Sequence, residues 1–175
     1  MPQPYDEDAF RAFVIARTPA LSRTAYLLTG DAHLAEDLVQ TALFKAAKSW
    51  HRIQGDPEPY VRRILYTQNI SWWRRRRFAE TPLDAHEATT AAPETGDRDL
   101  RLSLEQALAQ LTLKQRTILV LRYFEDLTEA QTAAVLGCAV GTVKSQGSAA
   151  LAKLRDLMGD DLDLTDLITE EGVLA

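Results

Sequence analysis

The chain has 175 residues and a formal net charge of -5, which allows one ordinary domain or two small ones. No uncharged apolar run approaches the roughly 18 residues that a membrane-spanning helix needs, and the acidic start MPQPYDEDAF is unlike a secretory signal. Cys138 is the only cysteine and the histidines are far apart, so we expect no internal disulfide, no metal or other cofactor, and a cytoplasmic protein without a membrane segment.

The first predicted helices fill residues 6–50. Helical spacing of apolar residues predicts one or two helices over residues 6–28, with Pro19 as a break or a first-turn residue and Gly30 at the end. Asp31 is a suitable N-cap for a helix that runs to about Trp50. The inner stripe of that helix is predicted to hold Leu34, Leu38, Ala42, Leu43, Ala46 and Trp50, and its outward positions are Glu36, Asp37, Gln40, Thr41 and Lys45.

Residues 60–78 are predicted to form a helix with two different faces, after a turn-rich loop at 54–59. The helix contains six arginines and no acid. One stripe is predicted to be core and consists of Val61, Ile64, Leu65, Gln68 and Trp72. The other mixes cations, aromatic rings and an amide, which suits single-stranded DNA, and consists of Arg62, Tyr66, Asn69, Trp73 and Arg76. Because a tryptophan at helical spacing is more often buried, we expect Trp72 in the core and leave Trp73 open between burial and base stacking.

Two acidic segments flank the second half of the chain. Residues 79–100 are rich in Pro, Thr, Ala and acids, which predicts a mobile linker. Residues 159–175 form an acidic tail that is either disordered or folds back onto a basic DNA-binding face.

Residues 101–126 are predicted to form two helices. Leu104, Leu108 and Leu111 mark the first helix, and a Thr112–Gln115 capping pair opens a second that continues to about residue 126. Lys114 and Arg116 lie near the start of that second helix, where cations fit the helix dipole poorly. A nearby phosphate would relieve this conflict, and so would exposure to solvent.

Residues 126–158 have the pattern of a helix-turn-helix. Thr128 and Gln131 form a capping box, and Gly137 ends the first helix. The inner positions are predicted to be Ala133, Ala134 and Leu136 in the first helix and Val140, Val143, Gly147, Leu151, Leu154 and Met158 in the second. Short polar groups face outward from the first two turns of the second helix, where such a motif presents side chains to DNA: Thr142, Lys144, Ser145 and Ser148. An ordinary helical hairpin with a solvated face remains the alternative.

The predicted fold class is all-α, with two small helical domains joined by a flexible acidic linker. The boundaries are residues 1–78, a linker at 79–100, residues 101–158, and a tail at 159–175.

These pieces together resemble the extracytoplasmic-function class of RNA polymerase sigma factors, in the sigma-E-like actinobacterial branch of the sigma-70 family. The most specific matches are HLAEDLVQTALFKA at 33–46, RYFEDLTEAQTAAVLG at 122–137 and GTVKSQGSAALAKLR at 141–155. The resemblance implies that residues 1–78 are sigma domain 2 and residues 101–158 are sigma domain 4. It implies a transcription initiation factor that is not an enzyme, directs core RNA polymerase to promoters and helps to melt them.

The resemblance also assigns residues to partners. It implies contact with the −10 element by Arg62, Asn69, Trp73, Arg74, Arg75, Arg76 and Arg77, and contact with the −35 element by Thr142, Lys144, Ser145, Ser148 and Lys153. It implies docking on the clamp coiled coil of the polymerase beta-prime subunit by Glu36, Asp37, Gln40, Thr41 and Leu43. The beta flap and an anti-sigma factor are further partners that this class allows, and no membrane contact is implied.

Three other interpretations of the sequence remain open. An activator or repressor would bind duplex DNA through its helix-turn-helix alone and would not need core polymerase. A protein-interaction module would use the basic helix against an acidic partner. An enzyme is disfavoured, because the sequence has no nucleotide-binding glycine loop, no clustered metal ligands and no nucleophile–base pair.

Overall fold

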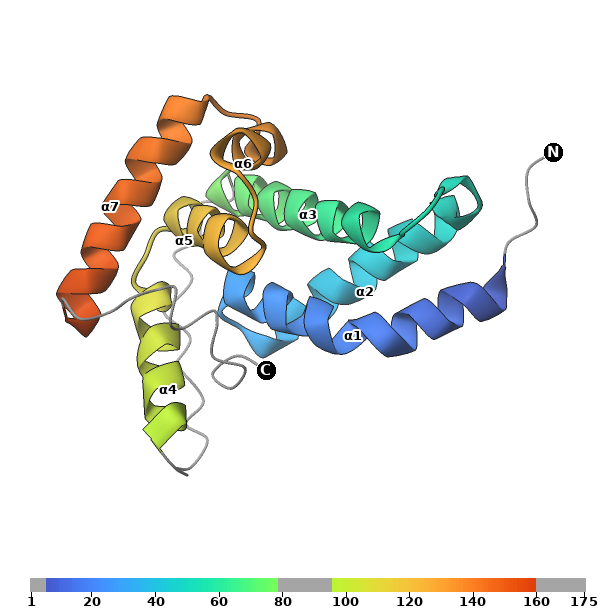
Figure 1. Ribbon diagram of the computed structural model, residues 1–175, viewed down its shortest axis with the longest axis horizontal. Helices are drawn as coiled ribbons and strands as arrows, with labels where there is room; N and C mark the ends of the chain where they lie inside the picture. The colour runs from blue at the N-terminus through green and yellow to red at the C-terminus, as the bar shows by residue number, and fades with distance from the viewer. Residues whose placement is uncertain (1–5, 79–95, 160–175) are drawn as a thin grey trace.

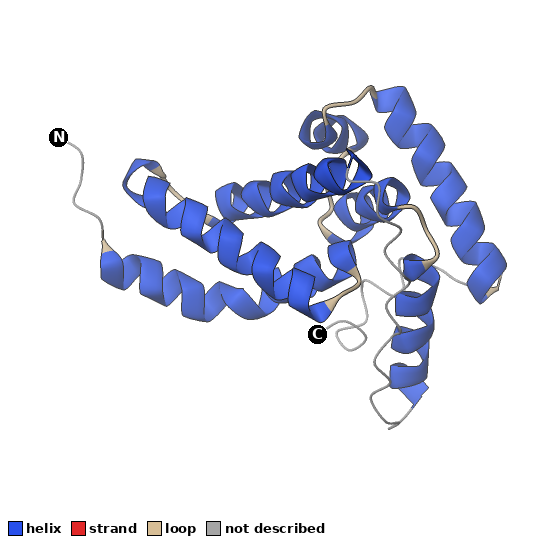
Figure 2. Cartoon of the chain, turned by 180° about the vertical axis from the view of Figure 1, so that it is seen from behind, coloured by secondary structure: helices blue, strands red, loops and turns tan. Residues whose placement is uncertain are grey.

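The computed structural model describes residues 6–78 and 96–159, and these residues form helices and loops without any strand (Figures 1 and 2). The all-α class predicted from the sequence is confirmed. The elements in chain order are α1 (Glu7–Thr29), α2 (Ala32–Ser49), η1 (Trp50–Arg52), α3 (Glu58–Phe78), α4 (Gly96–Ala109), α5 (Leu113–Leu119), η2 (Val120–Phe124), α6 (Glu129–Leu136) and α7 (Val140–Met158).

Helix α1 is one continuous helix that passes through Pro19, so the prediction of a break or a first-turn position there was wrong. Proline has no N–H to bond the carbonyl four residues earlier, which belongs to Ile15. Ile15 is 72% exposed, so this stretch of the helix lies against solvent, which can hydrate the free carbonyl. The other backbone hydrogen bonds of this long helix, together with the N-cap bond of Asp6, outweigh the loss of this one bond.

The turn between α1 and α2 follows the sequence prediction. Gly30 ends α1 in the left-handed region at φ 68°, and its N–H donates to the Tyr26 carbonyl at 2.7 Å. The Asp31 carboxylate then accepts from the Leu34 N–H at 2.9 Å and caps α2. Such a short connection sets α2 back against α1, and α3 packs on α2 (Figure 1). At the far end, Trp50 packs its ring against Phe10 and Phe13.

The second half of the chain contains the predicted capping boxes. Thr112 and Gln115 cap α5, and Thr128 and Gln131 cap α6 through the same pair of reciprocal bonds. The helix that begins at α5 does not stay regular to residue 126, because its last turn, η2, widens to a π-helix. Asp126 lies two residues after η2 with a φ of 53°, in the left-handed region, so the backbone there is not helical before α6 begins.

The helix-turn-helix forms as predicted, with two corrections to its inner face. Gly137 ends α6 in the left-handed region at φ 64°, and α7 buries Val143, Ala150 and Leu154. Val140 is 40% exposed and Ala134 is also exposed, so both predictions of burial were wrong. Position 140 is the first residue of α7, and a helical side chain leans toward the N-terminus, so Val140 reaches past the end of the helix.

The two halves of the described chain pack directly against each other rather than standing apart. Buried residues from α1, α2 and α3 and from α4 to α7 belong to one continuous apolar core. Helices α1 and α3 meet α5, η2 and α6 along this seam (Figure 1). Helix α4 begins at Gly96, so residues 96–100 are helical although the sequence placed them in the linker. The remaining linker, residues 79–95, and the tail beyond Gly159 lie outside the described residues.

Arg116, near the start of α5, is stabilised by neither of the two contacts that the sequence suggested. Its side chain is buried, with 6% exposed, and its Nε donates to the Leu108 carbonyl at 2.9 Å near the end of α4. Burial lowers the pKa of the Arg116 guanidinium. The cation therefore satisfies the C-terminal end of another helix, and neither a phosphate nor solvent is needed.

Candidate nucleic-acid interface

The outward side of α7 carries the predicted duplex-reading residues, and we call Thr142, Lys144, Ser145 and Ser148 the α7 face. Lys144, Ser145 and Ser148 are exposed, and Thr142 is half-buried. Val143 and Ala150 on the other side are anchored in the core, so the helix cannot turn without exposing them. The arrangement presents one amine and several small hydroxyls on the first turns of a helix that a major groove can accept.

The polar groups of the α7 face make few and weak interactions with other residues of the chain. The Lys144 Nζ lies 3.6 Å from a Glu129 carboxylate oxygen, and both side chains are substantially exposed, so this ion pair is weak. The Ser145 hydroxyl donates to the Thr142 carbonyl at 3.2 Å, a local bond that it can exchange for a base or phosphate. Lys153 is exposed, but its Nζ donates to the Gln110 carbonyl at 2.6 Å and so ties α7 to the end of α4.

The middle of α3 lies on the seam between the two halves of the chain. Arg62 donates from Nη1 to both oxygens of Glu125, at 2.8 and 2.6 Å, and from Nε to Glu58 at 2.9 Å. Glu58 also accepts Arg17 at 3.0 Å. Burial lowers the pKa of Arg62, but Glu125 and the hydrogen bond to Glu58 more than offset this, so the pKa is raised overall. Both the Nε and the Nη1 groups of Arg62 are therefore already bonded to carboxylates within the protein.

Two other members of the predicted single-strand stripe are also buried on this seam. Tyr66 is 4% exposed, and its hydroxyl donates to Glu125. Burial, followed by the charge of Glu125, raises the pKa of the Tyr66 phenol far above its usual range. Asn69 is 8% exposed, and its amide donates to the Thr117 hydroxyl at 3.5 Å. The stripe predicted to meet opened DNA is thus covered by the second half of the chain.

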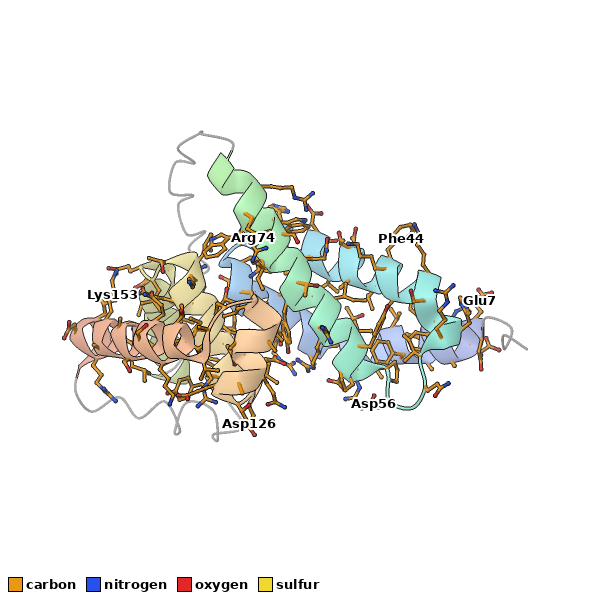
Figure 3. The ribbon with its side chains drawn as sticks, turned by 90° about the horizontal axis from the view of Figure 1, so that it is seen from above. Glu7, Phe44, Asp56, Arg74, Asp126 and Lys153 are labelled. Atoms are coloured by element: carbon orange, nitrogen blue, oxygen red, sulfur yellow. The ribbon has the colours of Figure 1, made fainter. Side chains whose placement is uncertain are left out.

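The C-terminal end of α3 is the open part of this helix. Arg74 and Arg75 are exposed, and the Arg75 Nε donates to the Ser71 carbonyl at 3.3 Å (Figure 3). Trp73 is half-buried and stays outside the apolar core, whereas Trp72 packs against the core as expected. Arg76 and Arg77 belong to the helix, but their side chains are outside the described part.

The outward side of α2 forms a second polar surface, away from the α7 face. Glu36, Asp37 and Gln40 are exposed, and the Gln40 amide donates to Glu36 at 3.2 Å. Thr41 and Leu43 are half-buried beside them. Figure 3 shows Phe44 on α2 and Lys153 on α7 toward opposite ends of the molecule.

Sequence reasoning missed two residues that the structure singles out. Phe44 is 62% exposed on α2, with Lys48 Nζ 4.4 Å from its ring centroid. Its position four residues after Gln40, on the outward side of the helix, was the available signal. Glu125 gave no signal, because its partners lie far away in sequence.

Among the described residues, no group of histidines, cysteines and acids is placed to hold a metal ion. Within the same ranges, no helix is both long and apolar enough to cross a bilayer.

Comparisons with known proteins match the chain along most of its length. A family model for Sigma-70 region 2 matches residues 8–79, and one for Sigma-70, region 4 matches residues 101–154. The RNA polymerase sigma-E factor of Streptomyces coelicolor is 37% identical over 165 residues, which are 93% of each chain. The ECF RNA polymerase sigma factor SigL of Mycobacterium tuberculosis is 35% identical over 155 residues, which are 83% of this chain and 86% of SigL.

Solved structures agree with these sequence matches. The sigma factor RpoE of Bartonella quintana, in complex with the anti-sigma factor NepR, has a TM-score of 0.70 and 28% identity, covering 89% of this chain and 99% of that one. CnrH, in complex with the cytosolic domain of CnrY, has a TM-score of 0.58 and covers 90% of this chain and 92% of that one. At 22% identity, CnrH is similar in fold alone.

Proposed function

This chain belongs to the extracytoplasmic-function class of sigma factors in the sigma-70 family, and we propose that it divides promoter recognition between α7 and α3. It is a transcription initiation factor, which binds core RNA polymerase and directs it to promoter DNA. The observation that carries the division of labour is the contrast between the two helices. The α7 face is largely exposed, and its polar side chains make few interactions within the chain. By contrast, the α3 stripe predicted to meet single-stranded DNA is exposed only at its C-terminal end.

In this proposal, the α7 face reads the −35 element from the major groove. Lys144, Ser145 and Ser148 reach base edges, because they project from a helix whose opposite side is anchored by Val143 and Ala150. Thr142 and Lys153 contact phosphates, which position the helix without specifying sequence. Lys153 reaches a phosphate by giving up its bond to the Gln110 carbonyl.

The basic end of α3 meets the −10 element. Arg74 and Arg75 are exposed, and Arg76 and Arg77 continue the same helix, so the run supplies cations for the backbone of a separated strand. Trp73, half-exposed beside them, is the ring on which a base can stack. Arg62 and Asn69 join this surface once the second half of the chain has moved off α3.

Docking on the polymerase uses the outward side of α2. Glu36, Asp37 and Gln40 supply exposed polar contacts, and Thr41 and Leu43 border them. Phe44 adds an exposed aromatic ring, a type of side chain that is enriched at protein interfaces. We assign this surface to the clamp coiled coil of the beta-prime subunit, with the second half of the chain placed toward the beta flap.

The remaining assignments follow from the same role. The chain carries no reaction of its own, because the polymerase supplies the chemistry, and it acts in the cytoplasm, where polymerase and promoter meet. RpoE of Bartonella quintana forms a complex with the anti-sigma factor NepR, and a protein inhibitor of that kind is a further partner proposed here.

Run-off transcription with purified core polymerase on a pool of genomic fragments tests the function. We expect discrete transcripts that require both the chain and the core enzyme. A helix-turn-helix activator would instead bind its duplex site without core polymerase. Failure of the chain to associate with core polymerase, or association without any specific start, would refute the proposal.

A further inference from the structure

The seam between the two halves of the chain is organised around one acidic side chain. Glu125 follows η2 in the second half, and its side chain is only 7% exposed. It accepts the Arg62 Nη1 at 2.8 and 2.6 Å, the Thr24 hydroxyl at 2.6 Å and the Tyr66 hydroxyl. All three donors belong to α1 or α3, so the carboxylate of one half is satisfied by the other half.

The donors around Glu125 are the kinds of groups that bind DNA phosphates. Protein contacts to phosphate oxygens come largely from arginine, lysine and hydroxyl side chains. Here a guanidinium and two hydroxyls converge on two anionic oxygens, in a site that excludes most water. The carboxylate therefore offers Arg62 the same kind of anionic oxygens that a backbone phosphate would offer.

Because of this contact, the α3 surface around Arg62 cannot bind Glu125 and a DNA strand at the same time. With Glu125 in place, Arg62 is only 22% exposed, and Tyr66 and Asn69 are buried. A DNA strand can reach Arg62 only after Glu125 has left. Separation of the halves also exposes the apolar core that they share, so opening needs an external source of binding energy.

We propose that Glu125 acts as an internal phosphate mimic that holds the free protein closed and screens Arg62 from DNA until the two halves separate. This inference rests on the proposed DNA-binding role of α3. It extends that role by naming the group that competes with DNA. Core polymerase, by holding the two halves apart on its surface, would supply the opening energy.

The first test measures opening without any DNA. A donor and an acceptor dye are attached at Gln54→Cys and Ala152→Cys, both exposed positions, in a Cys138→Ser background. Glu125→Gln keeps the shape of the side chain and removes its charge, so we expect energy transfer to fall as the halves separate. Glu7→Gln is the matched control, because Glu7 also pairs with an arginine but at an exposed site far from the seam (Figure 3). Unchanged energy transfer in Glu125→Gln would overturn the proposal.

Thr24→Val provides a second variant if Glu125→Gln fails to fold. Thr24 donates to Glu125 from α1 and is not among the residues assigned to the −10 element, and valine preserves its shape. A smaller fall in energy transfer is expected, with an unchanged helical circular dichroism spectrum. Unchanged energy transfer in a folded Thr24→Val protein would exclude a closing role for the Glu125 contacts.

The second test measures DNA binding by the free protein. Apparent affinity is reduced by the fraction of protein in the competent state, so a protein that is closed about 90% of the time loses about tenfold. We expect Glu125→Gln to bind a labelled single-stranded oligonucleotide pool of random sequence roughly tenfold more tightly than wild type. The gain should disappear in the Glu125→Gln/Arg62→Gln double variant.

These outcomes distinguish the proposed closing contact at Glu125 from the DNA-binding function that it is proposed to control. Loss of core-dependent transcription in the wild-type protein would refute the proposed function, while the energy-transfer result would still report on closure. Opening of Glu125→Gln without any gain in DNA affinity, or a gain that persists without Arg62, would overturn the phosphate-mimic role.

Discussion

Substitution of Gly30 by alanine tests whether the two halves of the chain are joined through Arg116. Gly30 has a φ of 68°, and a Cβ added there would lie 2.6 Å from the Arg116 Nη1. A flexible arginine could usually move aside, but this one is buried and its Nε is bonded to the Leu108 carbonyl. The new methyl group therefore has to displace a guanidinium that is almost fully buried and bonded through its Nε.

The magnitude follows from two separate contributions. An alanine in the left-handed region costs about 1–2 kcal/mol. Loss of the charge-assisted bond from Arg116 adds about 1.5–3 kcal/mol. We expect Gly30→Ala to lower the free energy of unfolding by about 2.5–5 kcal/mol, a large part of the total stability of an ordinary domain.

The control is Gly137→Ala, at the turn of the helix-turn-helix. Gly137 has nearly the same φ, 64°, but nothing lies within 4 Å of its added Cβ. This variant should therefore lose only the backbone contribution of about 1–2 kcal/mol. Urea denaturation followed by far-ultraviolet circular dichroism measures both free energies.

The two variants together can refute the reasoning. If Gly30→Ala and Gly137→Ala agree within about 0.5 kcal/mol, Arg116 is not held in place as described. A double-mutant cycle provides a further check, because Arg116→Met removes the group that the methyl would strike. In that background, the effect of Gly30→Ala should shrink to that of Gly137→Ala, and an unchanged effect would contradict the proposed contact.

Further predictions concern both binding surfaces and the seam. Lys144→Ala should weaken promoter binding by the holoenzyme by about 1–3 kcal/mol in a filter-binding assay if the amine reads a base; unchanged affinity with an intact fold would reject that role. Phe44→Ala should weaken binding to core polymerase by about 2 kcal/mol in a competition assay while leaving the melting temperature unchanged, since the ring is 62% exposed. Because the pKa of Tyr66 is raised in the folded protein, its stabilising contribution is complete below the ordinary tyrosine pKa of about 10 and is lost as pH rises above it. The free energy of unfolding should therefore fall less steeply above about pH 10 in Tyr66→Phe than in wild type, and parallel pH profiles would contradict this assignment.

The local elements of the fold could be predicted because their signals lie within a few residues of one another. Asp31, the Thr112–Gln115 pair and the Thr128–Gln131 pair each begin a helix through side chains that reach the nearest backbone amides. Gly30 and Gly137 end helices because glycine enters the left-handed region without strain. Pro19 was misjudged, since a long helix tolerates the loss of one bond where the free carbonyl meets solvent.

Burial at the ends and edges of helices was harder to predict. Val140 fits the apolar spacing of α7, but its position at the start of the helix leaves it exposed. Phe44 is apolar and yet exposed, because its position four residues after Gln40 places it on the outward side of α2.

The sequence by itself determined an all-helical chain with a helix-turn-helix, a basic helix and a family, because caps, periodicity and motifs depend on residues close together in the chain. Only the tertiary structure decided that the middle of the basic helix is covered. Arg62 and Glu125 are separated by 63 positions, and Tyr66 and Glu125 by 59. No local pattern specifies such a pairing, because it depends on how the apolar faces of α1, α3, α5 and α6 fit together around one core.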